Sequence, residues 1–89
     1  MEPSQILESL LDVAREAGLE VRPVAHGEPD LPQPGSGVVK LKGRVYVMLS
    51  SVDPVAIQLE VLASALREHA ADFVEARHLP PALREWLDG

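Results

Sequence analysis

Hydrophobic positions in the first 17 residues recur at helical spacing. The main stripe is Ile6, Leu10, Val13 and Ala17, and Leu7, Leu11 and Ala14 widen it. A stripe of this kind predicts an amphipathic helix from about Pro3 to Ala17. Ser4 is placed to cap its N-terminus, and Gly18 suits the left-handed position that follows a helix.

A second helical stripe follows residue 54 and contains Val55, Leu59, Leu62, Leu66, Ala70 and Phe73. Asp53 as N-cap and Pro54 as the first helical residue predict its start. Because further apolar residues broaden the stripe, we expect two packing partners: the sheet, and either the first helix or another subunit. The helix should end near residue 70.

The C-terminal part is less regular. Residues 72–79 fit either a frayed helix or an extended chain, and both interpretations stay open. Pro80 and Pro81 then predict a short final helix, Ala82 to Leu87, anchored by Leu83, Trp86 and Leu87.

Two other segments alternate with the period of a strand. Residues 19–24 put Leu19, Val21 and Pro23 on one face, and the proline either places this strand at a sheet edge or ends it. Residues 25–37 are rich in glycine and proline and show no period, which predicts a long loop. Residues 38–49 alternate again and predict a β-hairpin.

The register of the hairpin decides which residues share a face. A two-residue turn at residues 42–43 would put Val39 and Val45 on opposite faces and split the apolar set. A three-residue loop, 41–43, keeps the two valines together, so we expect that arrangement. The helices should then cover Val39, Val45, Val47 and Leu49, while the outward face carries Lys40, Arg44, Tyr46 and Met48.

The predicted order is helix, three strands, helix and a short C-terminal helix. This order is typical of an α+β two-layer domain, with a three-stranded sheet, antiparallel or mixed and mostly antiparallel, packed against two long helices. The 89-residue chain is short enough for a single domain, 1–89. A domain of this size has a small core, so oligomerisation would add stability.

Composition narrows the habitat and the chemistry. The absence of cysteine excludes disulfides, thiolate nucleophiles and cysteine-ligated zinc. No apolar run approaches a membrane span and the N-terminus lacks a signal-peptide pattern, so we expect a cytoplasmic protein without membrane contact. Six arginines against two lysines, eight prolines and no asparagine or threonine are typical of a thermophilic bacterium.

The net charge of −6 is unevenly distributed along the chain. Residues 1–20 carry −4, residues 21–53 carry +1 and residues 54–89 carry −3. The predicted helices are therefore acidic and the hairpin region is mildly basic. The cations of this region are Arg22, Lys40, Lys42 and Arg44. Four cations with one aromatic residue bind phosphates weakly, which disfavours nucleic acid as a partner.

The candidate metal ligands are His26, Glu28 and Asp30, which lie close together in the long loop. Loops of this composition are more often solvated than metal-binding, so we predict no metal and no cofactor. His69, Asp72 and His78 could approach one another only if the chain turned sharply after the second long helix. We expect His69 and Asp72 to form a surface pair instead.

Other catalytic signatures are incomplete, and no catalytic residue is predicted. Pro29-Asp30 followed by Lys40 is similar to a nuclease motif, but a valine stands where the second carboxylate would bind Mg²⁺. The order of elements is similar to the start of the small zinc peptidases that cleave phage-type repressors. The second long helix, however, lacks their H-E-x-x-H motif. P-loop, Rossmann and nucleophile-elbow motifs are also absent from the sequence.

Three stretches resemble a small bacterial family of uncharacterised proteins: Gly37–Met48, the helix over 59–66, and Leu79–Leu87 with the sequence LPPALREWL. The shared features are an N-terminal helix, G-L-x-V, a glycine-containing loop, a basic-glycine-basic hairpin and the closing P-P-A-L/V-R-E-x-L. These motifs are structural, so the resemblance implies no activity.

These observations together predict a non-catalytic interaction or structural module, with a homodimer or another protein as the complex. The interaction candidates are Lys40, Arg44, Tyr46 and Met48, because an aromatic and a thioether on the outward face of a thin sheet indicate a partner. A metal-dependent or degenerate hydrolase is the alternative, and weak nucleic-acid binding through the hairpin is a second alternative.

Overall fold

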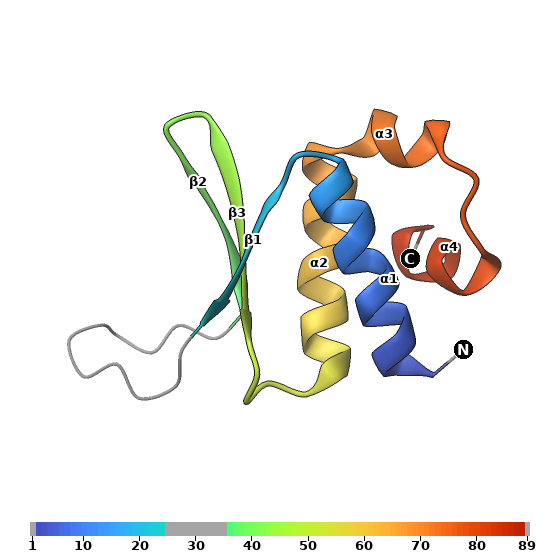
Figure 1. The fold of residues 1–89 in the computed structure, drawn as a ribbon, viewed down its shortest axis with the longest axis horizontal. Coiled ribbons are helices and arrows are strands. Elements are labelled where there is room, and N and C mark those ends of the chain that lie inside the picture. The colour runs from blue at the N-terminus through green and yellow to red at the C-terminus, as the bar shows by residue number, and fades with distance from the viewer. Residues whose placement is uncertain (1, 25–35, 89) are drawn as a thin grey trace.

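The computed structural model describes residues 2–24 and 36–88. A three-stranded sheet packs against two long helices, and two short C-terminal helices lie on their far side (Figure 1). In chain order the elements are α1 (Pro3–Glu16), β1 (Glu20–Val24), β2 (Gly37–Leu41), β3 (Arg44–Ser50), α2 (Val55–His69), α3 (Ala71–Ala76) and α4 (Pro81–Asp88). The predicted mix of helices and strands is confirmed, but the C-terminal helices add a third layer.

The sheet is mixed, with strand order β1-β3-β2. β1 pairs with β3 in parallel, and β2 pairs with β3 antiparallel, so the prediction of a mostly antiparallel sheet is wrong. β3 takes the centre because its inward residues Val47 and Leu49 are the ones the helices bury. The two edge strands then lie on opposite sides of β3 and run in opposite directions.

Both ends of α1 are fixed locally. The N-cap is Glu2, two residues before the predicted Ser4, and its backbone N–H donates to Oε1 of Gln5 at 3.0 Å. At the other end Gly18 adopts φ +90°, as its position in the sequence predicts. The N–H of Leu19 then donates to the carbonyl of Ala14 at 3.0 Å, which closes the helix and turns the chain into β1.

The turn between β3 and α2 differs from its prediction. α2 begins at Val55 with Pro54 at the N-cap, so Asp53 is not the capping residue. One carboxylate oxygen of Asp53, Oδ2, instead accepts both the backbone N–H and the hydroxyl of Ser36, each at 2.8 Å. These two donors, the backbone N–H first, hold the pKa of Asp53 below its ordinary value. Ser36 Oγ also accepts the N–H of Ser50 at 2.9 Å, so the start of β2 is joined to the end of β3.

Residues 72–79, for which the sequence allowed either a helix or an extended chain, contain both. α2 ends at His69, the chain bends at Ala70, and α3 continues to Ala76. Arg77 is extended, and its guanidinium forms an ion pair with Glu16 at the end of α1. The Arg84 guanidinium donates to the carbonyl of Arg77 at 2.8 Å, which ties this extended segment to α4. The predicted final helix is confirmed.

α2 lies at the centre of the fold and contacts β3, α1 and α4 (Figure 1). These neighbours bury the centre of its apolar stripe, since Leu59, Leu62 and Leu66 are each 0% exposed, whereas Ile57 in the first turns of the helix stays 42% exposed. Leu83 and Leu87 of α4 cover the side of α2 that faces away from the sheet. Apart from Ile57, the breadth of the stripe is therefore explained within the chain, by α1 and α4. Within the described residues, no helix is both long and apolar enough to cross a membrane.

Candidate functional site

The hairpin turn sets the arrangement of the outward face. Lys42 and Gly43 both have positive φ, 52° and 80°, which is the pattern of a two-residue type I′ turn. Leu41 therefore pairs with Arg44, and Val39 pairs with Tyr46. The predicted three-residue loop is wrong, because the type I′ turn matches the right-handed twist of the two strands and the separation of two valines is the smaller cost.

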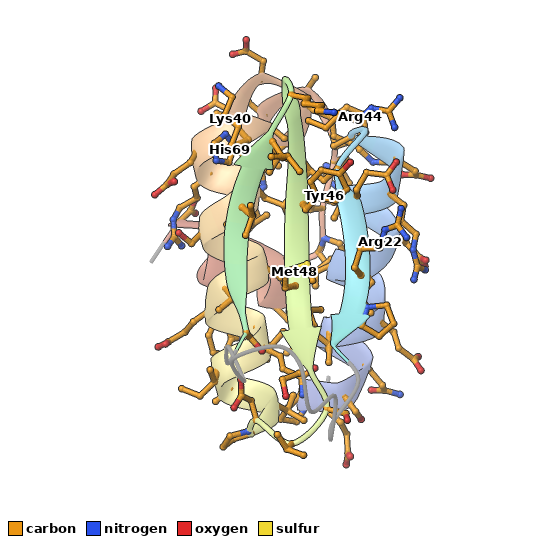
Figure 2. All side chains as sticks on the ribbon, turned by 90° about the vertical axis from the view of Figure 1, so that its left-hand side faces the viewer. Arg22, Lys40, Arg44, Tyr46, Met48 and His69 are labelled. Carbon is orange, nitrogen blue, oxygen red and sulfur yellow. The ribbon has the colours of Figure 1, made fainter. Side chains whose placement is uncertain are left out.

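This register exchanges the two faces of β2. Val39 and Leu41 lie on the outward face, where they are 49% and 55% exposed. Lys40 pairs with Val45 and so lies on the helix side, which makes its assignment to the outward face wrong. Figure 2 shows Lys40 at the outer edge of β2, on the side of α2 that carries His69.

The other three predicted interaction residues do share one face. Figure 2 views the sheet from the side opposite the helices and shows Arg44, Tyr46 and Met48 on β3 and Arg22 on β1. The register places Val39 beside Tyr46 on the same face. We call this surface the open face; its members are Glu20, Arg22, Val39, Leu41, Arg44, Tyr46 and Met48. No described element lies over it.

Charges gather at one side of the open face. Glu20 lies 3.8 Å from the Arg22 guanidinium and 3.7 Å from that of Arg44, measured between carboxylate oxygen and Nη atoms. The Arg22 guanidinium also lies over the Tyr46 ring, with 6.0 Å between Cζ and the ring centroid. The net charge of the open face is +1, from two arginines and one glutamate. Apolar side chains occupy the rest of it, toward β2.

The two edges of the sheet are less suited to binding than its face. β1 contains Pro23, which has no N–H to donate to an added strand. β2 carries the charged Lys40 on its helix side, where an added strand would have to desolvate it. A proline and a charged residue at these positions are typical of sheet edges that do not add a further strand.

The remaining candidates form no site. His26, Glu28 and Asp30 lie outside the described residues. Among residues 2–24 and 36–88, no three His, Cys, Asp or Glu side chains are grouped to hold a metal. The predicted pair of His69 with Asp72 does not form an ion pair there; His69 Nε2 lies 3.8 Å from Glu68 instead.

Sequence reasoning missed Val39 and Leu41 as surface residues and Glu20 as the partner of the two arginines. The signal for the first two was the Lys42-Gly43 dipeptide, since a glycine after a flexible polar residue favours a two-residue turn. The resulting surface offers apolar contact and both signs of charge. Comparison with protein-family models, with curated proteins and with solved structures finds no match to this chain.

Proposed function

We propose that this protein is a non-catalytic interaction module that associates with a second copy of itself through the open face. The observation that carries the proposal is the uncovered apolar patch formed by Val39, Leu41, Tyr46 and Met48. A sheet this thin normally buries one face and exposes polar residues on the other. Here two of the outward residues of β2 are large, apolar and about half exposed. We further propose, from its cysteine-free composition, that it acts in the bacterial cytoplasm.

The layering of the fold favours the open face over other surfaces for self-association. β3, α1 and α4 bury the leucines of the α2 stripe, so α2 offers a partner only the single exposed Ile57 from its apolar residues of that size. Pro23 and Lys40 disfavour pairing through the sheet edges. Of the exposed large apolar side chains, Val39 and Leu41 lie together on the open face, where a second copy can cover them, while Val38, Val52 and Ile57 lie outside it.

The charges of the open face support a second copy of the chain as its partner. The open face carries Glu20 together with Arg22 and Arg44, so a two-fold axis can bring the carboxylate of one copy to a guanidinium of the other. Because Lys40 lies on the helix side, the open face also has one cation fewer than predicted for contacting the phosphates of a nucleic acid.

The size of the patch sets the expected affinity. Two strands of five residues and one of seven cover roughly 14 Å by 17–24 Å, or on the order of 240–340 Å² of footprint. Stable protein interfaces bury about 800 Å² per partner, so we expect a transient dimer whose dissociation constant is micromolar or weaker.

Sedimentation equilibrium from micromolar to millimolar protein tests the proposal. We expect the apparent mass to rise from the 9.6 kDa of the monomer toward twice that value. Val39→Lys puts a charge in the centre of the patch and should weaken association at least about tenfold. The matched control is Val52→Lys, because Val52 is 60% exposed and lies in the turn before α2, outside the open face.

Two results would contradict the proposal. One is a mass that stays at the monomer value over the whole concentration range. The other is equal weakening by Val39→Lys and Val52→Lys, which would point to general charge repulsion or to another surface. Circular dichroism of both variants checks that the fold is retained.

A further inference from the structure

A solvent-open hollow lies between α2 and α4, on a different part of the molecule from the open face. Its volume is about 640 Å³, within the range of small-molecule sites. Its apolar floor and wall are Ala63 and Trp86, and its polar rim is Glu60, Ser64, Arg67 and Glu85. The small side chains at 63 and 64 leave this space on the surface of α2.

The rim of the hollow carries more negative than positive charge. Glu60 and Glu85 form no ion pair with any described residue, and both are exposed. Arg67 lies on the same rim, where its Nη1 donates to the backbone carbonyl of Trp86 at 2.8 Å near the C-terminal end of α4, so the net charge of the rim is −1. The C-terminal end of a helix carries partial negative charge, which attracts the Arg67 guanidinium and holds it there. The hollow thus presents two unpaired carboxylates around an indole.

We propose that this hollow binds a small organic cation, a quaternary ammonium with a compact apolar body. Among the aromatic side chains, the indole ring attracts a cation over its face most strongly. Apolar methyl groups on the cation match Ala63 and the ring, and Glu60 and Glu85 neutralise its charge. The site is independent of self-association, because it lies across the helical layers from the sheet.

The chain has a built-in reporter for this site. Trp86 is its single tryptophan, so intrinsic indole fluorescence reports on the hollow alone. The probe is choline, titrated into the full chain at constant ionic strength, with its uncharged tert-butyl analogue as the neutral comparison. We expect a saturable fluorescence change with choline and binding about tenfold weaker for the neutral analogue.

Variants of the rim test where the cation sits. Glu60→Gln and Glu85→Gln should each weaken choline binding about threefold or more, because each removes one neutralising charge at nearly constant shape. Glu8→Gln is the matched control, since Glu8 is exposed on α1 and does not line the hollow. It should leave the affinity unchanged. Trp86→Phe, followed by ligand-observed NMR, should weaken binding through the smaller ring while circular dichroism checks the fold.

Four outcomes would overturn the inference. A fluorescence response to choline that does not saturate means that no site exists. Equal affinity for choline and its neutral analogue, or equal loss in Glu8→Gln and Glu60→Gln, means that the carboxylates of the hollow do not select the charge. Tighter binding of the zwitterion betaine than of choline means that Arg67 acts as a carboxylate receptor and that the ligand class is wrong.

Discussion

The register of the β2–β3 hairpin supports the proposed self-association and can be tested by substituting valine with threonine. Threonine keeps the shape and branching of valine and its strand propensity, and replaces one methyl group by a hydroxyl. The three test positions are Val39, Val45 and Val47. The structure places Val39 on the open face and the other two on the helix side.

The expected cost follows from burial at each position. Val47 is 0% exposed, so Val47→Thr loses a buried methyl group and buries a hydroxyl without a partner, for about 2–3 kcal/mol. Val45 is half-buried, and Val45→Thr should cost about 1 kcal/mol. Val39 is 49% exposed, and Val39→Thr should change the free energy of unfolding by about 0.5 kcal/mol or less.

Urea unfolding, followed by circular dichroism, measures these differences. An 89-residue domain has a slope of about 1 kcal/mol per molar urea, so Val47→Thr should lower the midpoint by about 2 M. Protein concentrations should be low enough that midpoints no longer depend on concentration, because a dimer through the open face would add its own contribution at Val39.

The alternative register gives a different order. With a three-residue loop, Val39 would face the helices opposite Val45, and Val39→Thr would cost as much as Val45→Thr or more. That result would refute the two-residue turn and would remove Val39 and Leu41 from the open face. The proposal of self-association would lose its apolar patch with them.

Three further perturbations test the supporting structure. Leu62→Ala at the 0%-exposed centre of α2 should cost about 3–5 kcal/mol and lower Tm by more than about 10 °C in calorimetry. Gly18→Ala should cost about 1 kcal/mol of stability in the urea assay, because Gly18 has a φ of +90°. This cost comes from the backbone alone, since an added Cβ would meet no atom within 4 Å. Gly37→Ala is the control: it lacks that strain and should be nearly neutral. Because the folded state lowers the pKa of Asp53, its stabilising contribution is complete above the ordinary value of 3.8 and is lost as pH falls through the lower folded-state pKa. Asp53→Asn should therefore lose less stability between pH 5 and pH 2 than the wild type does in the same urea assay. An equal loss would contradict the role of Ser36.

Local signals in the sequence were sufficient to predict most elements. The stripe ending at Ala17 and the glycine after it predict α1 and its C-terminus, and the structure has the expected positive φ at Gly18. Pro80 and Pro81 likewise predict α4. In these cases the determining interactions lie within a few residues along the chain, which is why a single sequence suffices.

Two of the failures involve a choice between partners distant in sequence, and the hairpin failure involves a local choice of turn. Asp53 and Pro54 form a regular helix start, yet the Asp53 carboxylate bonds to Ser36, 17 residues away. The parallel pairing of β1 with β3 depends on which strand takes the centre, and no short-range pattern states this. In the hairpin, grouping the apolar residues was given more weight than the turn geometry of Lys42-Gly43, and the backbone preference is the stronger effect.

The broad apolar stripe of α2 and the charge asymmetry have a common consequence for function. α4 covers the side of α2 that a partner would otherwise be needed to bury, so the helical layers close on themselves and present an acidic exterior. The sheet has no such second layer on its outward side in the described part of the chain, and it carries the apolar residues of β2 beside a net charge of +1. Because the acidic helices of another copy and its apolar sheet face are alternative targets, the salt dependence of self-association separates them. Face-to-face contact should change little with salt, because salt screens both the few pairs between Glu20 and the arginines and the repulsion between two chains of charge −6. Sheet-to-helix contact should weaken, because salt screens the opposite charges that hold it together.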